Sequence, residues 1–157
     1  MSRRNKPPKR TARPDAKFGD ERVSKFINRM MMRGKKSTSE RIFYEAMDTI
    51  EKRIKDAKPL EVFHAAVKNA TPLVEVKARR VGGSTYQVPL EVRGERGFGV
   101  ACSNIIKFAR TRSGKDMASC LADELLSAYR NEGSAVKKKD ETHRMAEASR
   151  AFAHYRF

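Results

Sequence analysis

One segment, residues 74–92, alternates apolar and polar side chains, whereas most of the remaining chain carries the spacing of amphipathic helices. The alternation is carried by Val74, Val76 and Ala78 before the glycine pair Gly82-Gly83, and by Tyr86, Val88 and Leu90 after it. Two period-two runs joined by glycines predict a β-hairpin. A lone hairpin is marginally stable in water, so helices must supply the core. The expected fold is mainly α, a six-helix bundle with a two-stranded β-hairpin arm protruding between helices three and four.

The tip of this arm is basic. Arg79 and Arg80 precede the turn, and Tyr86 follows it. A protruding arm would present two guanidinium groups and an aromatic ring to a molecule outside the domain. Because guanidinium groups match phosphate oxygens in charge and geometry, we expect that molecule to be a polyanion.

The overall charge agrees with such a partner. The chain has 35 lysines and arginines against 19 acidic residues, a formal net charge of +16 over 157 residues, which favours nucleic acid or an anionic surface. No stretch of about 18 apolar residues and no secretory signal is present, so we expect a soluble, intracellular protein with no membrane partner. The two cysteines, Cys102 and Cys120, are too few for a disulfide framework and are expected to be buried thiols.

Residues 1–17 form a basic tail that we expect to be disordered when free. Three prolines prevent a helix, and the segment has little apolar surface to bury. A solvated leader is the plainer alternative, but basic arms often become ordered along a phosphate backbone. The tail residues that we expect to bind RNA are Arg3, Arg4, Lys6, Lys9 and Arg10. The remaining residues, 18–157, fit a single helical domain with the arm at about residues 73–92.

Three helices are expected before the arm. Apolar residues at helical spacing begin at Val23, and Gly34 supplies a stop. The sequence from Ser37 to Glu40 fits a capping box that would start the second helix. The third helix has Pro59 in its first turn and ends before Pro72, because a proline ring clashes with the preceding helical turn.

Three further helices are expected after the arm. The fourth apolar stripe covers residues 98–109, although Gly97 and Gly99 weaken its first turn. The fifth helix covers residues 117–128. A sixth, residues 136–149, is too polar to be central.

The sequence offers little for catalysis or cofactor binding. The glycines around Phe98 lack the preceding strand and the downstream glycine of a nucleotide-binding loop. His143 and Glu147 share a helix face, but two ligands without a third do not define a zinc site. No nucleophile has a neighbouring base, and the adjacent carboxylates Asp123 and Glu124 diverge on a helix. We therefore expect no enzyme activity, no cofactor, no metal and no small-molecule substrate.

Basic residues instead gather at the connections between helices and on the arm. Each cluster alone fits a solvated face, but several loops that converge on one polyanion suit a folded RNA better than one groove of DNA. The candidate RNA-binding side chains of the folded part are Lys35, Lys36, Lys77, Arg79, Arg80, Arg96, Arg110, Arg112 and Lys115. A DNA-binding architectural protein, which would tolerate any duplex, is the alternative.

Several motifs occur in the order that they have in a known family. They are Lys25-Phe26-Ile27-Asn28, Gly34-Lys35-Lys36-Ser37-Thr38, Arg79-Arg80-Val81-Gly82-Gly83, Tyr86-Gln87-Val88-Pro89, Leu121-Ala122 and Arg150-Ala151-Phe152-Ala153-His154-Tyr155-Arg156. With these motifs the chain resembles the family of small-subunit ribosomal protein seven. The resemblance implies a structural protein that binds the 3′ major domain of small-subunit ribosomal RNA and nucleates assembly of the subunit head.

The resemblance also implies partners and a position. The arm tip and the C-terminal tail would lie beside the transfer RNA of the exit (E) site and the outgoing messenger, with ribosomal proteins nine and eleven as neighbours. The residues that it places near transfer RNA or messenger are Gly82, Gly83, Tyr86, Arg150, His154, Tyr155 and Arg156. The implied location is the small ribosomal subunit of a bacterial-type cytoplasm, and encoding by an organelle stays open.

Overall fold

The computed structural model describes residues 11–155, and the predicted RNA-binding residues Arg3, Arg4, Lys6, Lys9, Arg10 and Arg156 lie outside them. The helices are α1 (Glu21–Met30), α2 (Lys36–Arg53), α3 (Pro59–Ala70), α4 (Gly94–Thr111), α5 (Met117–Tyr129), α6 (Ser134–Ala148) and a short 3₁₀ helix, η1 (Arg150–Tyr155). Strands β1 (Val74–Val81) and β2 (Ser84–Glu91) lie between α3 and α4 and pair antiparallel. The predicted mainly α fold with an inserted hairpin is confirmed, and η1 is an element that the sequence pattern did not indicate.

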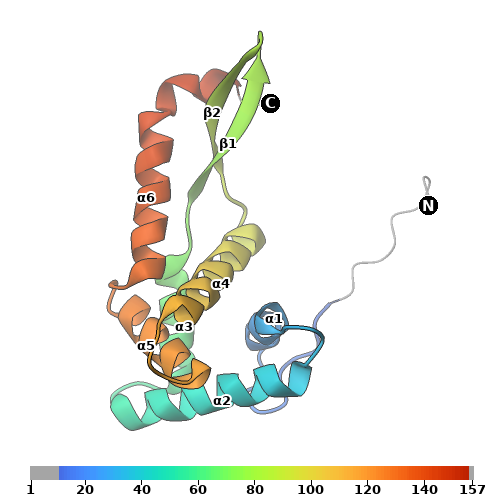
Figure 1. Cartoon of the computed structure of the whole chain (residues 1–157), viewed down its shortest axis with the longest axis vertical. Helices are drawn as coiled ribbons and strands as arrows, with labels where there is room; N and C mark the ends of the chain where they lie inside the picture. The colour runs from blue at the N-terminus through green and yellow to red at the C-terminus, as the bar shows by residue number, and fades with distance from the viewer. Residues whose placement is uncertain (1–10, 156–157) are drawn as a thin grey trace, which may run out of the picture.

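The hairpin rises from one end of the helical body, with α6 running beside it (Figure 1). Helix α6 packs against β1, and η1 packs against β2. The arm therefore protrudes from α1–α5 but is accompanied by the C-terminal elements. Helix α6 buries only Ala135, Val136 and Ala146, which agrees with the peripheral place that its polar sequence predicted. None of the helices among the described residues is long and apolar enough to span a membrane.

The core lies where α5 packs against α2, α3 and α4 and where α1 covers α2. Phe26 of α1, Phe43 of α2 and Phe63 of α3 are fully buried, and their ring centroids lie 5.3–5.6 Å apart. Aromatic pairs in such geometries contribute about 0.5–1.5 kcal/mol beyond the area that they bury. A packed interior of this kind fixes the relative positions of the loops at its surface.

Two helices begin at an aspartate. Oδ1 of Asp20 accepts hydrogen bonds from the backbone N–H groups of Arg22 at 2.6 Å and Val23 at 3.4 Å, which caps α1. Asp116 caps α5 by accepting a hydrogen bond from Ser119 N at 3.1 Å. Hydrogen bonds from Ser119 lower the pKa of Asp116, because they favour its charged form. These caps satisfy backbone donors that have no partner inside their own helix.

Helix α4 runs without a break through Gly97 and Gly99, the glycines that were expected to weaken its first turn. A Cβ atom on Gly97 would lie 2.9 Å from Cγ2 of Thr71, and one on Gly99 would lie 3.0 Å from a guanidinium nitrogen of Arg29. The glycines therefore allow α4 to approach the end of α3 and the side chain of α1 closely. That close packing offsets their low helix propensity, which is about 1 kcal/mol per residue.

Asp15 ties the beginning of the described chain to α2. Its carboxylate accepts hydrogen bonds from the Tyr44 hydroxyl at 2.8 Å and from the backbone N–H groups of Lys17 and Phe18 at 3.1 and 3.0 Å. Burial, and then the hydrogen bond to Asp15, raises the pKa of Tyr44 to about 12. Asp15 is only 8% exposed. This residue, which was expected to belong to the tail, therefore packs against the helices.

Candidate nucleic-acid interface

The connection between α1 and α2 presents Lys35 and Lys36 at the surface. The backbone N–H of Lys35 donates to Met32 O at 3.0 Å, which closes a turn whose central residues, Arg33 and Gly34, have φ of 52° and 74°. Two consecutive left-handed residues are typical of a type I′ turn. Gly34 is therefore a turn residue beyond the end of α1 and not the residue that stops this helix.

Helix α2 begins at Lys36 and has no side-chain cap. The capping box predicted from Ser37 to Glu40 is wrong, because the helix starts before Ser37 and Glu40 pairs with Lys36 at 3.6 Å. Both side chains of that pair are exposed, so it contributes little to stability. Lys36 remains reachable for a phosphate group from outside.

On the arm, the predicted cations divide between two faces. Arg79 stands directly opposite Tyr86 in the strand register. Because cross-strand partners share a face and successive residues alternate, Arg79 lies on the Tyr86 face and Arg80 on the opposite, exposed face. Lys77 pairs with Glu75 of the same strand at 3.5 Å. The two arginines therefore do not act as one double cation.

Tyr86 is the residue through which the arm meets η1. Its ring centroid lies 5.1 Å from that of Phe152 and 5.4 Å from that of Tyr155. The His154 ring lies 4.0 Å from the Tyr155 ring, and its Nδ1 is 2.9 Å from Ala151 O. The structure thus brings together three of the residues that the resemblance placed near transfer RNA or messenger.

Three others of that group lie at the ends of these elements. Gly82 and Gly83 form the hairpin turn with φ of 57° and 88°. Added Cβ atoms would meet nothing within 4 Å, so the backbone conformation, and not lack of space, favours glycine there. Arg150 is exposed at the start of η1.

Arg96, in the first turns of α4, reaches back to the arm. Its Nε lies 2.8 and 3.0 Å from the two carboxylate oxygens of Glu75. The hydrogen bond from Arg96 lowers the pKa of Glu75. Arg96 therefore connects the base of β1 to α4, and it shares the Glu75 carboxylate with Lys77 of the same strand.

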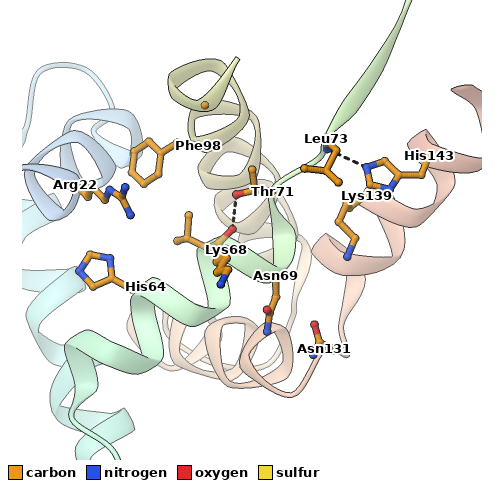
Figure 2. Close-up of a pocket in the computed structure, with 12 residues that line it drawn as sticks. Arg22, His64, Lys68, Asn69, Thr71, Leu73, Phe98, Asn131, Lys139 and His143 are labelled. Atoms are coloured by element: carbon orange, nitrogen blue, oxygen red, sulfur yellow. Dashed lines mark hydrogen bonds between the residues drawn. The ribbon is translucent and has the colours of Figure 1, made fainter. Parts of the chain in front are cut away.

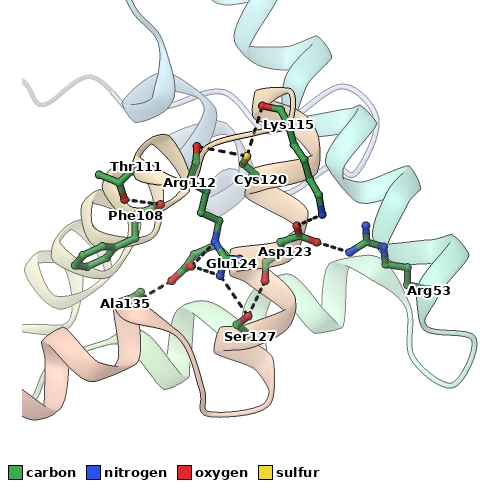
Figure 3. Close-up of polar contacts among 10 residues, drawn as sticks. All are labelled: Arg53, Phe108, Thr111, Arg112, Lys115, Cys120, Asp123, Glu124, Ser127 and Ala135. Carbon is green, nitrogen blue, oxygen red and sulfur yellow. Dashed lines mark hydrogen bonds and ion pairs between the residues drawn. The ribbon is translucent and has the colours of Figure 1, made fainter.

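The connection between α4 and α5 carries a network of polar contacts (Figure 3). Arg112 donates to Oε2 of Glu124 from Nε at 3.0 Å and from Nη2 at 2.6 Å. The Glu124 side chain is fully buried, and its other oxygen accepts a hydrogen bond from Ala135 N at 3.0 Å. One carboxylate of α5 therefore joins the α4–α5 connection to the first turn of α6.

Asp123, the neighbour of Glu124, has separate partners. It pairs with the Lys115 ammonium at 3.0 Å and with the Arg53 guanidinium of α2. Burial opposes ionisation of Asp123, but these two cations outweigh it and lower the pKa. Arg110 also bonds within the fold, donating to Met30 O at 2.9 Å. The predicted RNA-binding cations Arg110, Arg112 and Lys115 thus all have partners within the protein, and each keeps part of its side chain exposed.

The described residues offer no sign of redox or metal chemistry. Cys102 and Cys120 are buried as predicted, and burial raises the pKa of Cys102 to about 12. No group of three or more His, Cys, Asp or Glu side chains within residues 11–155 could hold a metal ion.

Two exposed cations that line a cavity were not predicted, Arg22 of α1 and Lys68 of α3. Neither belongs to a basic cluster at a connection, so the charge pattern did not indicate them. The signal available in the sequence was weaker. Arg22 is next to the buried Val23, and Lys68 is next to the buried Val67. A residue beside a buried position of an apolar stripe lies at the edge of the packed face of its helix.

A packed helical body with basic connections and a projecting arm defines a structural, polyanion-binding class of protein. The sequence model of the family described as Ribosomal protein S7p/S5e matches residues 2–150. The chain is 57% identical over 157 residues to Small ribosomal subunit protein uS7 of Arthrospira platensis and 55% identical to that of Synechococcus sp. (strain JA-2-3B'a(2-13)), with full coverage of both chains in each pair. It is 54% identical over the same length to Small ribosomal subunit protein uS7c of Paulinella chromatophora. The chain therefore belongs to the S7p/S5e family of ribosomal proteins.

Family membership confirms the main functional prediction. The chain is a structural constituent of the small ribosomal subunit and not an enzyme, and binding of ribosomal RNA is general to its family. Its relatives include a chloroplast-type protein as well as bacterial ones.

Proposed function

We propose that the chain is a primary RNA-binding protein that binds the 3′ major domain of small-subunit ribosomal RNA and nucleates assembly of the subunit head. The observation that carries this proposal is the fixed arrangement of three separate contact surfaces on one body. They are the Lys35-Lys36 connection, the exposed Arg80 face of the arm, and the C-terminal segment packed along the arm.

The mechanism is electrostatic and geometric. Arginine and lysine side chains release counterions from RNA phosphates, which supplies affinity without sequence information. Because the helical core holds the surfaces at fixed separations, an RNA junction binds all of them at once in only some of its conformations. Binding then shifts the junction toward those conformations. Binding of the protein thereby orders the RNA junction. Neighbouring proteins, such as ribosomal proteins nine and eleven, then assemble on the ordered RNA.

Reconstitution of the small subunit with this chain omitted tests the assembly role. We expect RNA of the 3′ major domain to stay heterogeneous and the proteins of the head to bind poorly, while the other domains assemble. Addition of the chain should restore the head. Normal incorporation of the head proteins without this chain would contradict the proposal.

We further propose that the arm tip and η1 face E-site transfer RNA and messenger in the assembled subunit. The supporting feature is the exposed turn at Gly82-Gly83 together with the aromatic cluster of Tyr86, His154 and Tyr155. Removal of residues 150–157 should leave RNA binding and assembly largely competent, because the Lys35-Lys36 connection and the exposed Arg80 face of the arm remain. Purified ribosomes that carry the truncation should retain deacylated transfer RNA less well or maintain the reading frame less faithfully. Normal retention and normal frameshifting would contradict this position.

A further inference from the structure

A basic cavity of about 470 Å³ lies between the body and α6 (Figure 2), and none of the predicted RNA-binding cations within residues 11–155 lines it. Its wall includes residues from α1, α3, the start of α4 and α6, and it contains no carboxylate among the lining side chains. The volume falls within the range of about 300–1,000 Å³ that small-ligand sites occupy. The lining has three cationic side chains, Arg22, Lys68 and Lys139, and this balance favours an anionic occupant.

Two cations at the cavity are available for a ligand. Arg22 and Lys68 are exposed, and among residues 11–155 no carboxylate oxygen forms an ion pair with either side chain. The third cation, Lys139 of α6, is only 20% exposed and pairs with the neighbouring Asp140 at 3.4 Å. Arg22 also stands at the first turn of α1, where the backbone dipoles favour negative charge.

Two imidazoles in the wall are held in place by the fold. His64 lies 2.7 Å from Oδ2 of Asp20, the residue that caps α1. Nε2 of His143 accepts a hydrogen bond from Leu73 N at 3.0 Å. An imidazole that accepts at Nε2 carries its proton on Nδ1, so the His143 ring retains one N–H donor.

The same cavity has an apolar side. Phe98 of α4 and Val67 of α3 line it, and Figure 2 places the Phe98 ring beside Arg22, with Leu73 on the other side of Thr71 next to His143. A ligand with an anionic group at Arg22 and Lys68 and a flat, weakly polar group over the Phe98 ring fits this arrangement.

We propose that this cavity binds a single unstacked nucleotide of the RNA, with its phosphate held by Arg22 and Lys68 and its base lying over the Phe98 ring. The inference rests on the proposed RNA-binding function and adds a base-sized pocket to it. Nucleotides that leave the helical stack present both a phosphate and an apolar base face, and proteins bind them through cations and aromatic rings.

The test compares two double variants of the full chain that have the same net charge. Arg22→Gln with Lys68→Gln alters the cavity, whereas Arg41→Gln with Lys52→Gln removes the same residue types from the exposed side of α2. Affinity for a 3′-domain RNA fragment is measured at several salt concentrations, together with chemical probing of every nucleotide. Circular dichroism melting confirms that both variants are folded.

We expect the cavity variant to lose at least about tenfold in affinity, since each phosphate contact by a charged group is worth a factor of that order. One unstacked nucleotide should lose its protection while the rest of the footprint persists. Phe98→Leu should expose the same nucleotide with little change in the salt dependence, because it removes the ring and no charge. The Arg41 and Lys52 variant should keep that nucleotide protected.

Free adenosine 5′-monophosphate distinguishes the two sources of a phosphate-bearing ligand. If it binds the unaltered chain and displaces no RNA nucleotide, the cavity takes free nucleotides and the proposal is overturned. Equal affinity and equal protection for the cavity and control variants would also overturn it, while leaving RNA binding itself intact. If the unaltered chain fails to bind the RNA fragment, the proposed function and this site fall together.

Discussion

Asp123 and Glu124 show that several cations of this protein form ion pairs within the fold. The two carboxylates are adjacent on α5, yet one holds Arg53 and Lys115 while the other holds Arg112. The sequence predicted that their side chains diverge. It did not predict their partners, because Arg53 lies 70 positions from Asp123 and no local pattern marks such a pair.

Glu124 is the buried charge whose loss we expect to cost most. Glu124→Gln keeps an acceptor for Ala135 N but weakens the bond to Arg112, and should lower the free energy of unfolding by about 1.5–3 kcal/mol. Glu124→Ala removes both acceptors and should cost about 3–5 kcal/mol. Urea unfolding measures this loss: the urea concentration at the midpoint should fall, while the dependence of the free energy of unfolding on urea concentration stays unchanged.

The matched control for Glu124 is Glu51→Gln, an exposed position on α2. It should change stability by less than about 0.5 kcal/mol. Equal midpoints for the two glutamine variants would show that Arg112 does not depend on Glu124, and would return Arg112 to the candidate RNA contacts.

The lowered pKa of Asp123 predicts how the stability of the protein changes with pH. Its pKa lies below the ordinary value of 3.8 in the folded protein, so the folded state binds this proton less readily than the unfolded state. Its stabilising contribution is therefore fully present above about pH 4 and is lost as pH falls through the lowered pKa. In Asp123→Asn, stability measured by urea unfolding from pH 6 to pH 2.5 should fall less steeply at the acid end. An acid limb identical to that of the unaltered chain would contradict the ion pairs of Figure 3.

At the scale of elements, the sequence predicted what depends on local periodicity and missed what depends on docking. Apolar residues recur every two residues in the hairpin and about every 3.6 residues in the helices. These periods are local properties of the sequence, so the sequence alone predicts the elements. The doubt about the start of α4 arose because the close approach of Thr71 to Gly97 is not a local property. The packing of Tyr86 against Phe152 and Tyr155 was missed for the same reason.

Removal of the outer half of the arm tests whether the hairpin is an appendage of the body. Residues 78–85, none of which is buried, are replaced by a short turn. Because Val88 at the base of the arm is fully buried and remains, the thermal transition and the helical circular dichroism should be nearly unchanged. Affinity for RNA should fall by more than it does in Arg79→Ala with Arg80→Ala, because the arm also contributes shape and backbone contacts.

The contrary outcome of that deletion is informative about α6. A large drop in melting temperature would mean that the tip of the arm is required to hold α6 and η1 in place. The arm would then be part of the core structure and not a separable contact surface.

At the scale of the whole molecule, net charge overstates the number of cations available to RNA. Arg110 donates to Met30 O and Arg112 binds the buried Glu124, whereas Lys35 and Lys36 of the α1–α2 connection lie at the surface. Composition alone indicated a polyanionic partner correctly. Which cations face that partner depends on tertiary pairing, so the candidate site was only partly predictable from sequence.

Lys35→Ala with Lys36→Ala should act through charge and not through the fold. Each lost phosphate contact should reduce the slope of log affinity against log salt by about 0.7–0.9, with an unchanged melting temperature. Lys115→Ala, which removes a lysine paired to Asp123, should show the reverse, a lower stability and an unchanged slope. A collapsed melting transition in the Lys35 and Lys36 variant would assign that pair to stability.

The central claim is that a rigid body with several basic surfaces recognises one folded RNA. Affinity measured at a single salt concentration for a 3′-domain fragment of small-subunit ribosomal RNA, an unrelated folded RNA of equal length and an equal-length DNA duplex tests it most directly, because the non-specific charge contribution is then shared. We predict binding to the 3′-domain fragment at least about a thousandfold tighter than to either competitor. Equal affinity for all three would contradict the account and would favour a protein that binds polyanions by charge alone.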